Sequence, residues 1–161
     1  MLSIRPAKPE EHEHIWAILE PVLRSGETYT LPRDISRADA LVYWHRPDHD
    51  VFVAEDDGKI AGTYFLRANQ GGGGSHVANA GYMTSPSFEG KGVGRAMLEH
   101  SLEHARARGF RAMQFNFVVS TNDRAVRTWR AYGFEIVGRL PGAFNHPRFG
   151  YVDAFVMFKL L

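Results

Sequence analysis

Three glycines alternate in the stretch SPSFEGKGVGRAML, at Gly90, Gly92 and Gly94, between a strand-like run and a helix-like run. The first N–H groups of a helix have no partner within it, and the helix dipole adds positive character there. Glycines have no Cβ, so they let a bulky anion approach these N–H groups closely. The alternative is a tight strand-to-helix turn that binds nothing.

The spacing of this turn excludes two familiar phosphate sites. A Walker-type loop needs Gly, four residues and then Gly-Lys-Ser/Thr, and the stretch has no such arrangement. A dinucleotide turn needs a small residue three places after its second glycine, and Arg95 stands at that place. We therefore expect a diphosphate as the ligand, without a Mg²⁺-dependent γ-phosphate.

Two asparagines lie on strand-like runs where their amides could meet. Side chains alternate along a strand, so Asn79 shares a face with Met83, and Asn116 shares one with Gln114 and Val118. If the two strands are neighbours, the amides converge. Amides suit a small zwitterion because each offers donors and an acceptor. The alternative is that both are ordinary buried amides satisfied by the backbone.

The elements that must position these residues follow from hydrophobic periodicity, caps and turn signals. We expect helices over 10–24, 37–46 and 92–108, and a further helix from Asn122 to Gly133. Strands are expected at 2–6, on both sides of the Asp57-Gly58 turn, and over 76–84, 110–119, 134–140 and 151–161. The order β-α-α-β-β-β-α-β-α-β-β predicts a mixed α/β sheet with helices packed on it.

Composition narrows the class of protein. The 161 residues suit one domain over 1–161. Nineteen basic residues against eighteen acidic ones argue against a nucleic-acid or membrane partner. The N-terminus lacks the apolar core of a signal peptide, and no apolar run approaches the ~20 residues of a membrane span. We therefore expect a cytoplasmic protein.

No metal site is expected either. The chain has no cysteine, which excludes disulfides, thiolate catalysis and cysteine-based metal sites. His100 and His104 have the i, i+4 spacing of a helical metal pair, but they lack the H-E-x-x-H arrangement. We interpret the two histidines as part of a solvated helix face.

The order of elements, the glycine turn and the stretch NDRAVRTWRAYGF together resemble the GNAT superfamily of N-acetyltransferases. The family's diphosphate loop, Arg/Gln-x-x-Gly-x-Gly/Ala, is matched by Glu89, Gly90, Lys91, Gly92, Val93 and Gly94. The later helix of the family, Asn-x-x-Ala/Ser-x-x-x-Tyr-x-x-x-Gly-Phe, is matched by Asn122, Ala125, Trp129, Gly133 and Phe134. The resemblance covers nearly the whole chain.

The resemblance implies a GNAT fold, with about seven strands, about four helices and a splay between the fourth and fifth strands. It implies acetyl-CoA as the donor, with its diphosphate on the amides from Gly90 to Arg95. The pantetheine arm would lie beside Met83 and Thr84, and a backbone N–H near Met83 would polarise the thioester carbonyl. Asn122 would cap its helix and hydrogen-bond the pantetheine.

The chain departs from the family pattern at two positions. Glu89 stands where Arg or Gln is usual, so we expect it to point into solvent while Lys91 and Arg95 assist the amides. Trp129 replaces the tyrosine that often protonates the departing thiolate, and an indole N–H is not a usable acid. Tyr132 is either a substitute acid or an ordinary core tyrosine.

Several stretches look like one branch of the superfamily, the acetyltransferases of proline analogues such as azetidine-2-carboxylate. They are TYTLP, VANAGYMTSP, FNFV and FEIVGRLPGAF…YVDAFVMFKLL; phosphinothricin-type enzymes are more distant cousins. This likeness implies that Asn79 lies near a substrate carboxylate and that Asn116 matches the Asn of the branch's FN-x-V strand. The loop that carries Glu27, Thr28 and Tyr29 would cover the acceptor, or would simply be solvated.

These observations predict an N-acetyltransferase that moves an acetyl group from acetyl-CoA to a small amino-acid-like amine by direct attack. One alternative is an acetyltransferase of a protein N-terminus or Lys, which would need an open acceptor groove. Another is a non-catalytic acyl-CoA-binding domain, which the missing tyrosine favours. A homodimer is one expectation for the assembly.

Overall fold

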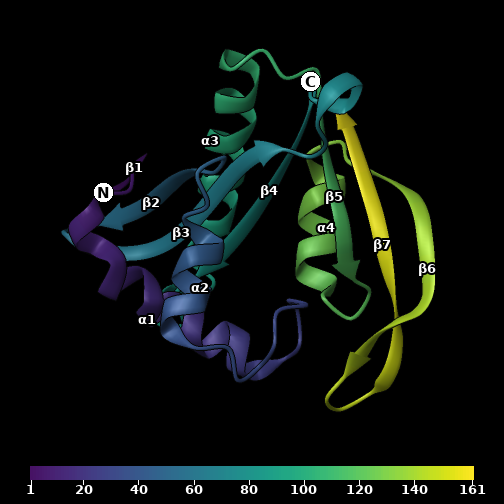
Figure 1. The fold of residues 1–161 in the computed structure, drawn as a ribbon, viewed down its shortest axis with the longest axis horizontal. Coiled ribbons are helices and arrows are strands. Elements are labelled where there is room, and N and C mark those ends of the chain that lie inside the picture. Colours follow the sequence, from purple (N-terminus) through teal and green to yellow (C-terminus); the bar gives the residue numbers. More distant parts are fainter.

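The computed structural model describes residues 1–161 and contains a single seven-stranded sheet in the order β1-β2-β3-β4-β5-β7-β6 (Figure 1). The strands are β1 (Leu2–Pro6), β2 (Asp50–Asp56), β3 (Lys59–Ala68), β4 (Val77–Thr84), β5 (Ala112–Val119), β6 (Glu135–His146) and β7 (Gly150–Leu160). The helices are α1 (His12–Ser25), α2 (Arg37–Trp44), α3 (Val93–Ala107) and α4 (Asp123–Ala131). The predicted order of elements is confirmed.

Local signals explain several boundaries. The Ser36 side chain accepts the Asp39 N–H at 3.0 Å and so caps α2, as its position before the helix predicts. Asp57 and Gly58 have φ of 48° and 78°, the pair of positive values that a tight two-residue hairpin between β2 and β3 requires. Gly109, with φ of 85°, follows the end of α3.

Helices cover both faces of the sheet and bury a separate core on each. Helix α3 buries Met97 and Leu98 in the first core, and Trp129 of α4 packs against that core. Helices α1 and α2 bury the second, which includes Trp44. The indole N–H of Trp44 donates to Thr63 Oγ1 at 3.0 Å, so the burial of this large side chain leaves no polar atom unpaired.

Strands β4 and β5 form the one parallel pair, and they pair only at one end. Val77 lies opposite Ala112 and Ala78 opposite Met113, and no further partners follow. Beyond this point the two strands diverge, as Figure 1 shows. The predicted splay between the fourth and fifth strands is therefore confirmed, and its closed end lies at Ala78.

A bulge in β5 corrects the predicted alternation of that strand. Phe115 lies opposite Met157 and Val118 opposite Phe155, so two residues of β5 face one residue of β7. The extra residue interrupts the period of two. Val118 therefore packs in the same core as Phe115, and it does not share a face with Asn116 as the simple alternation predicts.

The prediction of a solvated face for His100 and His104 is wrong. Both side chains are half-buried on α3. Tyr64 Oη lies 2.7 Å from His100 Nδ1, and His104 Nε2 lies 2.9 Å from a carboxylate oxygen of Asp50. The pair therefore joins α3 to strands β2 and β3.

None of the helices has both the length and the apolar character that crossing a membrane would demand.

Candidate functional site

The glycine turn lies between β4 and the start of α3. Gly90 and Gly92 have φ of 74° and 81°, which side chains with a Cβ rarely adopt. A Cβ added at either position would meet no atom within 4 Å. The space above the backbone of this turn is therefore open to a ligand.

The start of α3 offers unpaired donors to that space. Gly92 is the N-cap and has no side chain to satisfy them. Along α3, the first N–H group that bonds a backbone carbonyl of the helix is that of Ala96, which donates to the Gly92 carbonyl at 3.0 Å. The N–H groups of Val93, Gly94 and Arg95 precede this bond and donate to no group of the chain. An anion fits these donors, and the helix dipole favours it.

Charged side chains flank the turn. Glu89 is exposed, and its carboxylate forms no hydrogen bond or ion pair, in agreement with the expectation that it points into solvent. Lys91 and Arg95 are also exposed and pair with no carboxylate. The Lys91 ammonium lies 5.0 Å from the centre of the Phe88 ring. Two cations therefore remain available beside the free amides.

The backbone of β4 presents one edge to β3 and the other to the splay. The Ser85 N–H donates to the Ala61 carbonyl at 2.8 Å, and the Val77 carbonyl accepts from the Asn69 N–H at 2.8 Å. Both bonds join odd-numbered residues of this stretch to β3. Backbone groups of alternate residues point to the same side of a strand, so the even-numbered residues of β4 point toward the splay.

This alternation corrects the role predicted for the Met83 backbone. Met83 lies opposite Thr63, so its N–H points toward β3 and not into the splay. Its side chain is 2% exposed and belongs to the core under α1 and α2. The N–H groups directed at the open edge are those of Tyr82 and Thr84. Thr84, unlike Met83, therefore presents its N–H to the open edge.

Helix α4 flanks the splay from the β5 side. Asn122 is its N-cap, and the Asn122 Oδ1 accepts the Ala125 N–H at 3.5 Å, so the predicted capping role is confirmed. Its Nδ2 is left without a partner in the chain. The Trp129 ring centre lies 5.3 Å from that of Tyr82 and 4.9 Å from that of Phe115. Trp129 therefore packs against both strands that part at the splay.

Tyr132 forms the C-cap of α4 and connects it to α3. Its hydroxyl donates to the Glu99 carboxylate, and this hydrogen bond raises the pKa of Tyr132 above its ordinary value. A raised pKa and a hydroxyl that is already hydrogen-bonded to a carboxylate both weaken the case for Tyr132 as a substitute acid.

The loop between α1 and α2 reaches β4 from the opposite face of the sheet. The Tyr29 hydroxyl donates to the Tyr82 carbonyl at 3.0 Å, on the open edge of β4, and burial raises the pKa of Tyr29. A Cβ at Gly81 would lie 3.2 Å from the Tyr29 oxygen and 2.7 Å from the Phe65 ring. Glycine is therefore needed at position 81 chiefly to accommodate the Phe65 ring, and it also leaves room for Tyr29.

The same loop also contacts the turn between β6 and β7. The Glu27 carboxylate lies 3.2 Å from the Arg148 guanidinium. Thr28, between Glu27 and Tyr29, is half-buried, and its side chain forms no hydrogen bond. The predicted acceptor loop thus contacts an element on each side of the splay.

The amides of Asn79 and Asn116 are connected through Gln114 and do not bond each other. Asn79 is 8% exposed, and its Nδ2 donates to the Gln114 carbonyl at 2.9 Å, across the closed end of the splay. The Gln114 side chain donates to Asn116 Oδ1 at 2.9 Å, and Asn116 Nδ2 donates to Asn69 Oδ1 at 2.7 Å. Asn116 itself is exposed.

Two residues that the sequence motifs do not indicate belong to this amide cluster. Asn69 follows β3 and bonds Asn116, while Arg67 lies on β3 directly opposite Asn79. Alternation along β3 places Arg67 and Asn69 on one face, but nothing in the sequence says which strand pairs with it, or in which register. That information comes only from the assembled sheet.

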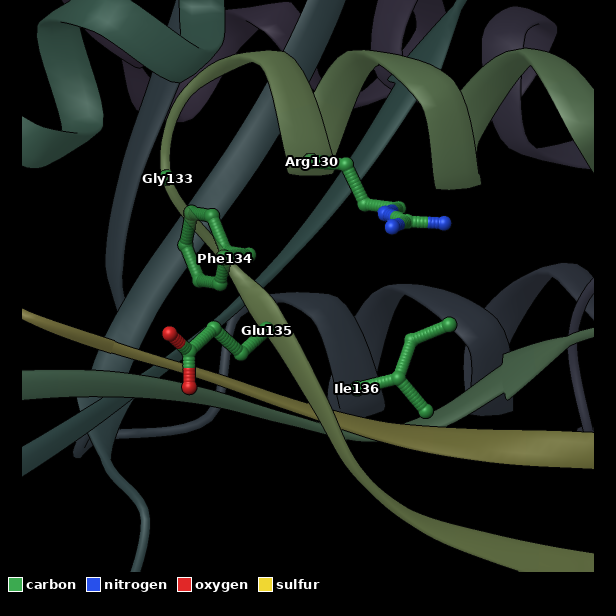
Figure 2. A pocket seen from close by; sticks show the side chains of 5 residues that line it. All are labelled: Arg130, Gly133, Phe134, Glu135 and Ile136. Carbon is green, nitrogen blue, oxygen red and sulfur yellow. The ribbon is translucent and has the colours of Figure 1, made fainter.

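A hollow elsewhere on the surface is shown in Figure 2. It is lined by Arg130, Gly133, Phe134, Glu135 and Ile136. The Arg130 side chain extends from α4 toward it, and Glu135 and Ile136 lie at the start of β6 (Figure 2). Glu135 of β6 and Gln114 of β5 lie opposite the same residue of β7, Phe158. The hollow is therefore level with the closed end of the splay. No predicted site residue lines it.

A parallel strand pair that parts next to an anion-binding helix start is the arrangement of an acyltransferase that uses a coenzyme thioester. The model of the Acetyltransferase (GNAT) family matches residues 10–134, and the chain belongs to this family of acetyl-CoA-dependent enzymes. N-acetyltransferase aca1 of Schizosaccharomyces pombe is 30% identical in an alignment 156 positions long, and the match covers 83% of this chain and 72% of that protein.

Solved structures show the same fold. A GCN5-related N-acetyltransferase from Kribbella flavida has a TM-score of 0.95 and 36% identity, and covers 99% of this chain and 98% of its own. A phosphinothricin N-acetyltransferase-like structure has a TM-score of 0.87 at 22% identity, covering 100% and 99%. The protein yncA from Salmonella typhimurium, solved with its cofactor acetyl-CoA, has a TM-score of 0.86 at 21% identity, covering 100% and 94%.

Proposed function

We propose that this acetyltransferase moves an acetyl group from acetyl-CoA to the amine of a small amino-acid-like acceptor by direct attack. One observation carries the proposal. Between β4 and β5 lies an open strand edge, with a free-amide turn at one end and a cluster of side-chain amides beside it. A donor and an acceptor could meet at that edge from opposite faces of the sheet.

The residues present fit acetyl-CoA, which supplies an acetyl group activated as a thioester. The free N–H groups from Val93 to Arg95 would hold its diphosphate, assisted by the Lys91 and Arg95 side chains. Thr84 would meet the pantetheine arm on the open edge of β4, and the unpaired Nδ2 of Asn122 would donate to it.

The chain would then hold the reactants and polarise the carbonyl. The N–H groups of Tyr82 and Thr84 are directed at the open edge, and a backbone donor there would stabilise negative charge that develops on the thioester oxygen. Holding an amine against the thioester removes much of the entropic barrier of a two-molecule reaction. The neutral amine would bond the thioester carbon as the C–S bond breaks, so that coenzyme A leaves as its thiolate and the extra proton of the nitrogen passes to water. No cysteine exists to form an acetyl-enzyme, which fits this direct route.

A dedicated acid is not required on this route. A thiol like that of coenzyme A has a pKa near the ~8.5 of a free cysteine, so its thiolate leaves more readily than an amine would. Trp129 would pack beside the pantetheine arm, which its contacts with Tyr82 and Phe115 support.

The contacts of the acceptor loop favour a small acceptor over a protein N-terminus or Lys. The Glu27–Arg148 ion pair joins the loop to the turn between β6 and β7, and a peptide chain entering between them would have to break it. The polar amide cluster near Asn79 supports a zwitterionic acceptor. The possible homodimer remains a prediction that light scattering can check.

Thiol release tests the proposal. The chain, with acetyl-CoA, is offered three kinds of acceptor: free amino acids including L-proline, peptides with a free N-terminus, and a Lys peptide. We expect release with the amino acids. Release with peptides alone would transfer the assignment to a protein acetyltransferase. Binding of acetyl-CoA with no release for any amine would support a non-catalytic acyl-CoA-binding domain.

A further inference from the structure

Arg67 differs from the other half-buried arginines of this chain. Three arginines are half-buried, Arg5, Arg24 and Arg67. Arg5 bonds the carboxylates of Glu11 and Glu55 at 2.6 and 2.5 Å. Arg24 donates to the Ile35 carbonyl at 2.8 Å and lies 3.7 Å from Glu20. Arg67 reaches only the adjacent Ala68 carbonyl, at 3.4 Å, and forms no ion pair. Arg67 is therefore half-buried without a paired anion.

The carboxylates nearest in the fold are bound by other groups. Asp50 is joined to His104 and Arg108 on α3. Asp48 is exposed and lies 3.6 Å from Arg46. The same Asp48 oxygen also lies 4.0 Å from His49 Nε2. Neither carboxylate forms an ion pair with Arg67.

His49 is one neighbour of Arg67. Its Nδ1 donates to the Trp44 carbonyl at 2.9 Å, and its Nε2 is buried without a partner. Burial lowers the pKa of His49, and the Trp44 carbonyl and the Asp48 carboxylate oppose this, while the positive charges of Arg67 and Arg46 add smaller lowering effects. A neutral His49 adds no positive charge beside Arg67.

Arg67 lies close to the open edge of β4. It is directly opposite Asn79, and Gly81, which Tyr29 approaches, is the next residue of β4 on the same face. Two residues advance a strand by roughly 6.8 Å, within reach of a long Arg side chain. To bind an acceptor beside Gly81, the Arg67 guanidinium would leave the Ala68 carbonyl, which faces β2, and turn toward β4. An α-amino acid separates its amine from its carboxylate by a single carbon, so one end can reach Arg67 while the other lies at the edge.

We propose that Arg67 binds the carboxylate of the acceptor and so selects amino acids over plain amines. The proposal rests on the acetyl transfer proposed above. The planar guanidinium suits a carboxylate, which can accept two parallel hydrogen bonds. Asn79 Nδ2 is occupied by Gln114, so Asn79 Oδ1 is the atom left to accept an N–H from the amine. Arg67 and Asn79 thus orient the two ends of the acceptor.

Matched pairs of acceptors test this role. L-proline is compared with pyrrolidine, and L-phenylalanine with 2-phenylethylamine, in the wild type and in Arg67→Gln, Arg67→Lys and Arg37→Gln. Arg37 is an exposed arginine on α2 that pairs with Glu13, so it controls for the loss of one charge. Acetyl transfer gives KM and kcat. Calorimetry with and without coenzyme A gives binding of the same four compounds, independent of turnover.

We expect the wild type and Arg37→Gln to prefer each amino acid over its amine. Arg67→Gln should raise KM for the amino acids roughly tenfold to a hundredfold, the range for a lost charged hydrogen bond, and leave kcat and the amines nearly unchanged. Arg67→Lys should recover part of the preference. An equal preference in wild type and Arg67→Gln, or none in the wild type by either method, overturns the assignment. Amine acetylation without that preference would leave the proposed transfer intact, whereas failure of acetyl transfer to any amine would count against the transfer alone.

Discussion

Trp129 shows how one residue can change the chemistry assigned to a site. Its place in the motif is that of a proton donor, but its ring packs against Tyr82 and Phe115 and its N–H is no acid at ordinary pH. The Tyr132 hydroxyl donates its hydrogen bond to Glu99 on α3. Neither side chain therefore offers a free acidic proton at the open edge of β4.

The pH dependence of turnover should follow from this. Activity should rise with pH as the acceptor amine loses its proton, and no protein acid should produce a matching fall at about pH 9–10. The pKa of Tyr132 is raised by its bond to Glu99, so any loss of its proton falls above the range ordinary for tyrosine. Trp129→Phe should keep substantial activity and Tyr132→Phe should cost little. A loss of kcat of roughly a hundredfold in folded Tyr132→Phe, with the alkaline limb removed, would instead establish Tyr132 as the acid.

Asn79 has two roles that one substitution can separate. Asn79→Ala leaves the Gln114 carbonyl without its donor at the closed end of the splay, which should lower the free energy of unfolding by about 1–3 kcal/mol. It should also raise KM for an amino acid on the order of tenfold or more, with acetyl-CoA affinity nearly unchanged. Urea unfolding and steady-state kinetics measure the two effects. Lower stability with an unaltered KM would make Asn79 purely structural.

At the scale of elements, local sequence signals predict the helices and strands and their order, but they do not predict how the strands pair. Caps, turn residues and hydrophobic periods predict all seven strands and four helices in order. The direction of the Met83 N–H depends on its register with Thr63, and register is a property of two strands. The bulge after Phe115 likewise arises from pairing with β7, so the face of Val118 could not be read from β5 alone. Arg67 could not be connected with Asn79 for the same reason.

The glycine turn allows a matched test of an element. Gly92 and Gly58 have φ of 81° and 78°, and a Cβ at either would meet nothing within 4 Å. Aspartate at each position imposes the same backbone strain and the same charge. Gly92→Asp should weaken acetyl-CoA binding strongly, because it places a carboxylate beside the free amides of α3. Gly58→Asp, on the hairpin between β2 and β3, should lower stability alone, because no unpaired helix N–H groups adjoin it. Equal affinities in the two variants by calorimetry would show that the diphosphate binds elsewhere.

At the scale of the whole molecule, the splay leaves the two halves of the sheet in contact mainly at its closed end. Only two residue pairs join β4 to β5, and Asn79 adds a side-chain bond to Gln114. Trp129 and the Glu27–Arg148 ion pair bridge the halves further along. A ligand that fills the splay would therefore add contacts between two strands that are paired at only two positions.

Acetyl-CoA should for this reason raise the thermal midpoint of unfolding. A ligand that binds only the folded state at a hundred times its Kd adds about 2.7 kcal/mol of stability. For a domain of this size about 1 kcal/mol shifts the midpoint by roughly 2–4 °C, so we expect a rise of roughly 5–10 °C. Scanning calorimetry measures the shift, and Gly92→Asp at the same ligand concentration should reduce it while Gly58→Asp preserves it. A wild-type midpoint that does not respond to acetyl-CoA would contradict the proposed donor site. The unpaired N–H groups at the start of α3 would then belong to a strand-to-helix turn that binds no ligand.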